Sequence, residues 1–186
     1  MAARLLDKFR KEVIFQMQEK YKIKNPMAVP HLDKVVVNMG VGEAISDVKI
    51  LDRAAQDLAM ITGQKPIIRR AKKAISNFKL RENLPVGCKV TLRRARMYEF
   101  VDRLVSISLP RIRDFNGTSR KAFDREGNYT LGISDQGIFP EIDAGSRDHR
   151  IQGMDITFVF KNGNRDQNFE ILRLLGMPFA KEPNKS

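Results

Sequence analysis

Residues 69–96 read RRAKKAISNFKLRENLPVGCKVTLRRAR, and the rest of the chain is arranged around this stretch. It holds ten basic residues against a single acid, Glu82, a net charge of +9 out of +12 for the whole chain. Cations at this density repel one another, whereas a polyanion relieves the repulsion and releases its own counterions on contact. The stretch therefore predicts a nucleic-acid contact. A solvated lysine-rich face is the alternative for any charge run, but such faces normally mix both signs.

Two strands flank the loop inside this stretch. In residues 86–94, apolar side chains alternate with small or polar ones, which is the period of a half-buried strand. Residues 65–70 form a shorter strand, and Pro66 near its start indicates an edge or first position. The connection of about 15 residues is far longer than a tight hairpin needs. We expect residues 71–84 to be a projecting, mobile loop in which Phe78 lies among cations.

The remaining elements follow from hydrophobic periodicity. Apolar residues spaced three or four apart predict helices over residues 4–22 (ended by Asn25-Pro26), from a cap at Ser46 or Asp47 to Gly63, over residues 96–109 (stopped by Pro110), and up to Gly176. Alternation predicts further strands over residues 32–39, 129–133 and 154–160.

The same hydrophobic spacing predicts which side chains lie in the core. In strand 32–39 these are Val35, Val37 and Met39. The helix before Gly63 is expected to bury Val48, Leu51, Ala55, Leu58 and Ile61. The helix before Pro110 is expected to bury Met97, Phe100, Val101, Leu104 and Ile107.

The order of these elements decides the fold class. A β-α-β-β-α-β unit sits between an N-terminal helix and a C-terminal strand and helix, and this is the split β-α-β arrangement. We expect an α+β fold of the ferredoxin-like or RRM-like kind, with an antiparallel sheet, helices packed on one face, terminal helices and a long basic loop. The chain is expected to form one RNA-binding domain, residues 1–186. The open face would carry Lys34, Asn38, Thr91 and Arg93.

Composition limits the class of protein. A hydrophobic content of 42% is ordinary for a globular domain, and a pI near 10.0 indicates an anionic partner. No run approaches the 18 or so apolar residues of a membrane span, and no lipidation signal is present. The single cysteine, Cys88, forms no internal disulfide, which fits a reducing compartment. The expectation is a soluble intracellular protein.

Cofactor and metal motifs are weak. Gly40 and Gly42 follow a strand, but Ile45 stands where a dinucleotide fingerprint needs its third glycine, so a turn that needs a permissive backbone is the better interpretation. His31, His149 and Cys88 lack the paired spacing of metal ligands. We expect neither cofactor nor metal.

Catalytic chemistry is equally unsupported. Glu141 and Asp143 are spaced two apart, but surface solvation explains them as well as acid–base work does. Cys88 lies on the apolar side of its strand, so a small core residue is favoured over an activated thiolate beside Lys89. No nucleophile with a base and an orienting partner can be assembled, so the sequence predicts no enzyme.

Several ordered blocks make the chain similar to one known family. They are NPMAVPHLDKVVVNMGVGEA (25–44), ITGQKP (61–66), AKKAISNFKLRENLPVGCKVTLR (71–93), LPRIRDFNG (109–117), GNYTLGI (127–133), IFPEID (138–143), GMDITF (153–158) and LLGMPF (174–179). On these blocks the chain resembles the bacterial-type ribosomal protein five family of the large subunit, whose members bind 5S rRNA in the central protuberance. The resemblance covers nearly the whole chain.

The resemblance implies a function and a set of partners. A member of this family folds as an antiparallel sheet backed by helices, binds 5S rRNA and anchors it to 23S rRNA. Its long loop, matching residues 71–84, reaches the peptidyl-site tRNA. A loop near residues 109–117 meets head protein thirteen of the small subunit, and other central-protuberance proteins are neighbours. The expected location is the ribosome in the cytoplasm, with no membrane and no small-molecule substrate.

The resemblance also implies particular contact residues. The family's 5S-contacting positions map onto Asn38, Gln64, Phe78 and Thr91. The charge pattern adds the basic candidates Lys34, Arg69, Arg70, Lys72, Lys73, Lys79, Arg81, Lys89, Arg93 and Arg94. The intersubunit bridge is expected at Arg111, Arg113, Asp114 and Phe115. The alternative function is a general basic RNA chaperone or ribosome assembly factor, which would bind RNAs promiscuously.

Overall fold

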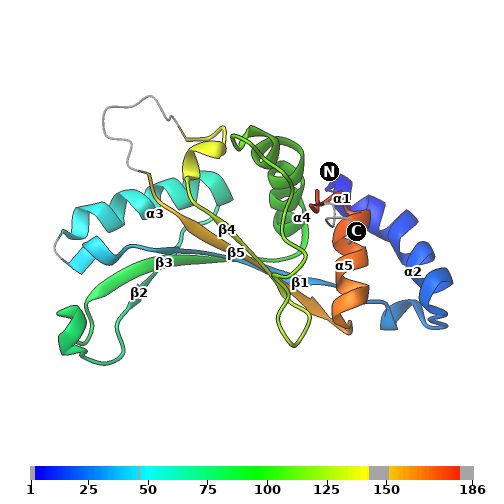
Figure 1. Cartoon of the computed structure of the whole chain (residues 1–186), viewed down its shortest axis with the longest axis horizontal. Helices are drawn as coiled ribbons and strands as arrows, with labels where there is room; N and C mark the ends of the chain where they lie inside the picture. Colours follow the sequence, from blue (N-terminus) through cyan, green and yellow to red (C-terminus); the bar gives the residue numbers. More distant parts are fainter. Residues whose placement is uncertain (1–2, 46, 143–150, 181–186) are drawn as a thin grey trace, which may run out of the picture. The chain divides into compact units, whose positions relative to one another are not determined.

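The computed structural model describes residues 3–45, 47–142 and 151–180. The chain divides into two compact units. The first unit comprises residues Met1–Val35, Leu92–Leu131 and Thr157–Ser186, and the second comprises Val36–Thr91 and Gly132–Ile156. Figure 1 labels the helices and strands, whose bounds follow.

Five strands form one antiparallel sheet in the order β2-β3-β1-β5-β4. Their bounds are β1 His31–Gly40, β2 Ile67–Arg70, β3 Pro85–Leu92, β4 Tyr129–Ile133 and β5 Met154–Lys161. The predicted α+β class is confirmed, and β2 lies at an edge as Pro66 indicated. The sequence order did not indicate that β5 lies between β1 and β4, leaving β4 as the second edge strand.

The helices fall where periodicity predicted them. Their bounds are α1 Arg4–Lys8, α2 Ile14–Tyr21, α3 Val48–Thr62, α4 Arg94–Arg103 and α5 Arg165–Leu174. A π-helical turn, Phe9–Val13, joins α1 to α2, so the N-terminal helix is continuous. It ends earlier than predicted, because Lys22 adopts a left-handed conformation at φ 54°. Asn25 instead caps a separate short turn, Pro26–Ala28.

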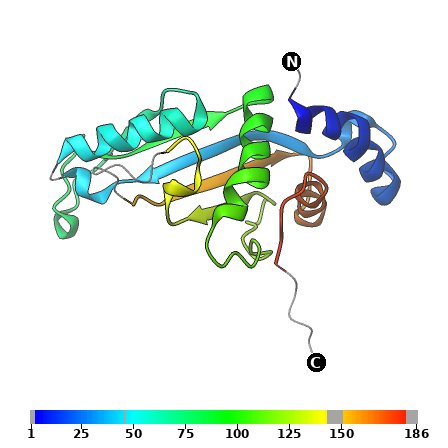
Figure 2. The ribbon, with the colours of Figure 1, turned by 90° about the horizontal axis from the view of Figure 1, so that it is seen from above.

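In the second unit, α3 packs on one face of the strands (Figures 1 and 2). Asp47 caps α3 by accepting a hydrogen bond from the backbone N–H of Lys49 at 2.9 Å, and Gly63 ends it at φ 64°. Ser46, the other predicted cap, lies outside the described residues. The buried stripe of α3 is Leu51, Ala54, Leu58, Ile61 and Thr62. The sheet contributes Val37, Met39, Cys88 and Val90.

Two core assignments in α3 were wrong. Val48 is 53% exposed, because it occupies the first turn, where the helix end leaves its side chain in solvent. Ala54 is buried and Ala55 is only half-buried. Ala54 lies three residues after Leu51 and Ala55 lies four after it. Both steps fit the helical period, so the spacing alone did not distinguish the two alanines.

The first unit is built from α1, α2, α4, α5 and the adjoining parts of the strands. Leu5, Phe9, Val13 and Met17 form the buried stripe of the N-terminal helix. An aromatic cluster surrounds Tyr129, whose ring lies 6.0 Å from that of Phe158 between centroids and whose hydroxyl donates to the Ser119 carbonyl at 3.0 Å. The rings of Tyr129 on β4 and Phe158 on β5 therefore belong to the core of this unit.

Helix α4 corrects one further expectation. Ile107 is 44% exposed, and Ser108 is buried in its place. The cause is a second π-helical turn, Leu104–Ser108, which follows α4 directly. A π turn has more residues than an α turn, so it rotates the apolar stripe. Pro110 does not end the helical segment abruptly, because it lies within a 3-10 turn, Leu109–Arg111, that follows the π-helical turn. Among the described residues, no helix combines the length and apolarity needed to cross a bilayer.

Candidate nucleic-acid interface

Residues 71–84 extend β2 and β3 as a hairpin, called here the basic hairpin. The N–H of Ala71 donates to the Leu84 carbonyl at 2.9 Å, and the N–H of Asn83 donates to the Ala71 carbonyl at 3.0 Å. Further out, Ile75 and Leu80 exchange two backbone bonds of 2.8 and 3.1 Å. The segment expected to be a long loop therefore has a defined, hydrogen-bonded path. Its mobility in the free protein stays a prediction.

The tip of the basic hairpin is a 3-10 turn, Ser76–Phe78. Lys79 closes it in a left-handed conformation at φ 50°. Phe78 is 71% exposed there, and Ile75 is 45% exposed. An exposed aromatic ring adds nothing to the core, whereas it offers a surface on which a nucleobase can stack.

The basic side chains of β2 and the hairpin are all exposed. They are Arg69, Arg70, Lys72, Lys73, Lys79 and Arg81. The Arg70 guanidinium donates to the Asn83 carbonyl at 3.0 Å and so braces the base of the hairpin. In the part of the chain that the structure describes, no carboxylate pairs with any of the six. Their charge is available to a partner outside the chain.

Polar candidates occupy the sheet face away from α3. Asn38 lies between the buried Val37 and Met39, so its half-buried side chain points to the opposite face. Thr91 does the same on β3, the neighbouring strand, and Lys89 shares its face. The Gln64 amide donates to the Thr91 carbonyl at 3.3 Å. The structure therefore brings Gln64 to Thr91 and puts Asn38 on the adjacent strand.

Three basic candidates lie in the first unit. Lys34 is half-buried on β1, and Arg93 and Arg94 are exposed. Arg93 lies outside β3, which ends at Leu92, and serves as the residue before α4. Its guanidinium lies 3.1 Å from the Asp33 carboxylate, so this charge is already partly matched. Arg93 still has an extended backbone, at φ −139° and ψ 159°, but the chain turns at the next residue, the left-handed Arg94, so β3 ends two residues before the predicted residue 94.

The bridge candidates lie in the same unit and begin at Arg111, the last residue of the turn Leu109–Arg111. Arg111, Arg113 and Asp114 are exposed, and Phe115 is half-buried. The chain just beyond is anchored, because the N–H of Thr118 donates to the Pro178 carbonyl at 2.7 Å. The three charged side chains are thus displayed from a segment with a fixed end.

Other chemistry finds little support. Among the described residues no three His, Cys, Asp or Glu side chains cluster as metal ligands. His149 and Asp143 lie outside the described residues. The turn interpretation of Gly40 and Gly42 was wrong in one respect: neither has a positive φ, and an added Cβ would meet nothing within 4 Å. The fold therefore does not require glycine at either position.

Cys88 is a core residue and not an activated thiol. It is fully buried, and burial, aided by the charge of Asp57, raises the pKa of its thiol to about 11. We expect Ellman's reagent at pH 8 to label it slowly in the native protein and fully in urea. Folding raises the pKa of the Cys88 thiol from its ordinary value of 9.0. The stability that this group contributes is therefore fully present below pH 9.0 and is lost as the pH rises toward about 11. Rapid native labelling would contradict this assignment.

Sequence reasoning overlooked Ile67. It is 70% exposed, and it pairs directly with Lys89 across β2 and β3, so it lies on the open face. All four residues of β2 are exposed, although two are isoleucines. The sequence did contain a sign of this exposure: two isoleucines stand directly before Arg69 and Arg70, in a strand that Pro66 marks as an edge strand. An exposed isoleucine at this place adds an apolar contact to a basic surface.

Comparison with known proteins gives a consistent result. The family model described as "Ribosomal protein L5" matches residues 25–81, and that of the "ribosomal L5P family C-terminus" matches residues 85–179. The chain is 56% identical over 177 residues to a large ribosomal subunit protein uL5 of Clostridium beijerinckii, covering 95% of this chain and 98% of the relative. It is 53% identical over 180 residues to that of Clostridium acetobutylicum, covering 97% and 99%.

Proposed function

This chain belongs to the ribosomal protein L5 family, and we propose that, as a structural constituent of the large ribosomal subunit, it binds 5S rRNA and anchors it to 23S rRNA. It is not an enzyme, and it works in the ribosome of the cytoplasm. The observation that carries the RNA proposal is the basic hairpin, whose exposed cations find no carboxylate partner among the described residues.

The open face of the second unit is our proposed 5S rRNA contact. Asn38 and Thr91 offer hydrogen-bonding groups on adjacent strands, and Gln64 is held against Thr91. Lys89 and Ile67 lie opposite one another at the same face. Among the residues that the structure describes, the strands of this face carry no pair of exposed aromatic rings, so phosphate, ribose and shape contacts dominate there, as in recognition of RNA duplexes.

The basic hairpin is proposed to serve a second RNA surface. Its exposed Phe78 and cations extend beyond the strands, which suits a contact with 23S rRNA and the peptidyl-site tRNA. Arg111, Arg113, Asp114 and Phe115 are proposed to meet protein thirteen of the small-subunit head. The charged members of that group are exposed, which such a bridge requires.

Alanine substitutions on the open face test the 5S proposal. We expect Asn38→Ala and Thr91→Ala each to weaken 5S rRNA binding about 2- to 12-fold, because each removes a hydrogen bond worth about 0.5–1.5 kcal/mol net. Thr130→Ala is the matched control, since Thr130 is an exposed strand threonine outside the proposed face. Fluorescence anisotropy gives the affinities, and circular dichroism checks the fold. Wild-type affinity in both variants would reject this face.

A competition experiment separates this function from the alternative of a general RNA chaperone. Labelled 5S rRNA is bound by the intact protein, and an unrelated RNA duplex of similar length is added. A 5S-specific protein keeps its ligand until the competitor is in large excess, because non-specific contacts are weaker. Equal competition by the unrelated duplex would instead favour promiscuous binding.

A further inference from the structure

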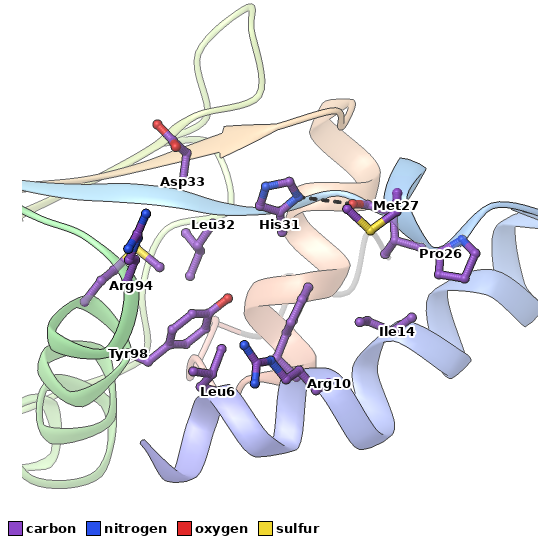
Figure 3. Close-up of a pocket in the computed structure, with 13 residues that line it drawn as sticks. Leu6, Arg10, Ile14, Pro26, Met27, His31, Leu32, Asp33, Arg94 and Tyr98 are labelled. Carbon is purple, nitrogen blue, oxygen red and sulfur yellow. Dashed lines mark hydrogen bonds between the residues drawn. The ribbon is translucent and has the colours of Figure 1, made fainter. Parts of the chain in front are cut away.

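A groove of about 680 Å³ opens in the first unit, among the N-terminal helix, the start of β1 and the first turn of α4 (Figure 3). This volume lies within the range of about 300–1,000 Å³ that holds ordered ligands. Leu6 and Ile14 line it from the helix, and Met27, which is 82% exposed, lies on its rim. An exposed methionine beside an open apolar groove is a common feature of protein-binding surfaces.

Two arginines give the groove its charge. Arg10 reaches it from the N-terminal helix and Arg94 from the start of α4. Within the described residues neither forms an ion pair. The one acid of the lining, Asp33, is already bound by Arg93 at 3.1 Å. The surplus charge is therefore positive, and the complementary ligand is anionic.

The lining favours a peptide over a nucleotide. Its phenyl and phenol rings, Phe9 and Tyr98, are only 7% and 4% exposed, so neither presents a face on which a base could stack, and the remaining aromatic ring, His31, is itself half-buried. The accessible apolar surface comes instead from aliphatic and thioether side chains, which fit aliphatic anchors. Burial raises the pKa of Tyr98 to about 12, so its hydroxyl keeps its proton as an additional donor.

We propose that this groove binds an acidic segment of another protein, which inserts aliphatic side chains against Leu6, Ile14 and Met27 and sets carboxylates on Arg10 and Arg94. Recognition by an apolar groove with charged rims follows the usual mode for amphipathic peptides. The residues of the open face and the basic hairpin take no part. Loss of 5S rRNA binding would therefore leave this proposal standing, and its failure would leave the RNA proposal intact.

Site-specific photocrosslinking in purified ribosomes tests the groove. Ile14 is replaced by p-benzoylphenylalanine, and the matched control carries the same probe at the neighbouring Phe15, which is 65% exposed and does not line the groove. After irradiation, mass spectrometry identifies the protein segment or the RNA that is crosslinked to the probe. We expect position 14, and not position 15, to crosslink to a protein segment in which apolar residues are flanked by Asp or Glu.

A second experiment reverses the charge of the two arginines in the groove. Arg10→Glu with Arg94→Glu should lower the crosslink yield from position 14 at least tenfold, because carboxylates then face carboxylates. Lys11→Glu with Arg96→Glu changes the charge equally at exposed neighbours outside the lining and should leave the yield unchanged. Thermal denaturation confirms that all variants fold. Crosslinking to rRNA, to a segment without acids, or equally from both positions overturns the proposal, as does a yield insensitive to Arg10 and Arg94.

Discussion

Replacing Lys72, Lys73, Lys79 and Arg81 by glutamine is expected to lower the affinity for 23S rRNA, the RNA surface proposed for the basic hairpin, by about 10²–10³-fold at physiological salt. Each phosphate neutralised by a cation contributes roughly −0.7 to −0.9 to the slope of log affinity against log salt. The loss of four contacts therefore makes the slope about 3 units less steep. At about 0.15 M salt, each lost contact lowers the affinity about 4- to 5-fold. The four side chains are exposed and lack carboxylate partners among the described residues, so the substitutions leave internal ion pairs intact.

Salt titration by filter binding measures both quantities. The matched control is the glutamine variant at Lys8, Lys11, Lys22 and Lys24, which removes the same charge from the N-terminal segment. If binding depends only on net charge, the two variants will behave alike, and the basic hairpin is then not the contact. A wild-type slope in the hairpin variant contradicts the interface directly.

Gly87→Ala is expected to reduce the free energy of unfolding by about 3 kcal/mol, through overpacking at a backbone-to-backbone contact. A Cβ at this position in β3 would lie 2.5 Å from the Met39 carbonyl oxygen and 3.4 Å from the Gly40 Cα. Both obstacles are backbone atoms of β1, so neither can rotate away. The strands would have to separate, although the N–H of Val41 donates to the Val86 carbonyl at 3.0 Å. For a chain of this size the loss corresponds to about 6–12 °C in Tm.

Gly132→Ala is the control, because Gly132 is also a strand glycine but its added Cβ would meet only the Asp155 carboxylate oxygen, at 3.6 Å. It should change stability by less than about 1 kcal/mol, as substitutions away from crowded features usually do. Urea denaturation followed by circular dichroism compares the two. Equal stability of the two variants would mean that β1 and β3 do not approach as closely at Gly87 as the structure has them.

Hydrophobic periodicity located the α-helices of the described residues and the strands β1, β3, β4 and β5, because each is specified by local spacing. Apolar residues two apart marked Val35, Val37 and Met39, and all three are buried. Local spacing failed where the backbone departs from the regular period, as at the π-helical turn that exposes Ile107. It also failed at the end of β3, because the left-handed turn at Arg94 leaves no pattern in the sequence.

Sequence alone determined the charge, the order of the elements and the family of this protein. Cations crowded between residues 69 and 96 indicate an anionic partner however the chain folds, since charge is additive along the chain. Only the tertiary structure decided that β5 separates β1 from β4, that Arg93 binds Asp33, and that Arg10 and Arg94 share one groove. Each of these depends on contacts between residues far apart in the chain, and such contacts are set by the packing of the whole fold and not by local spacing.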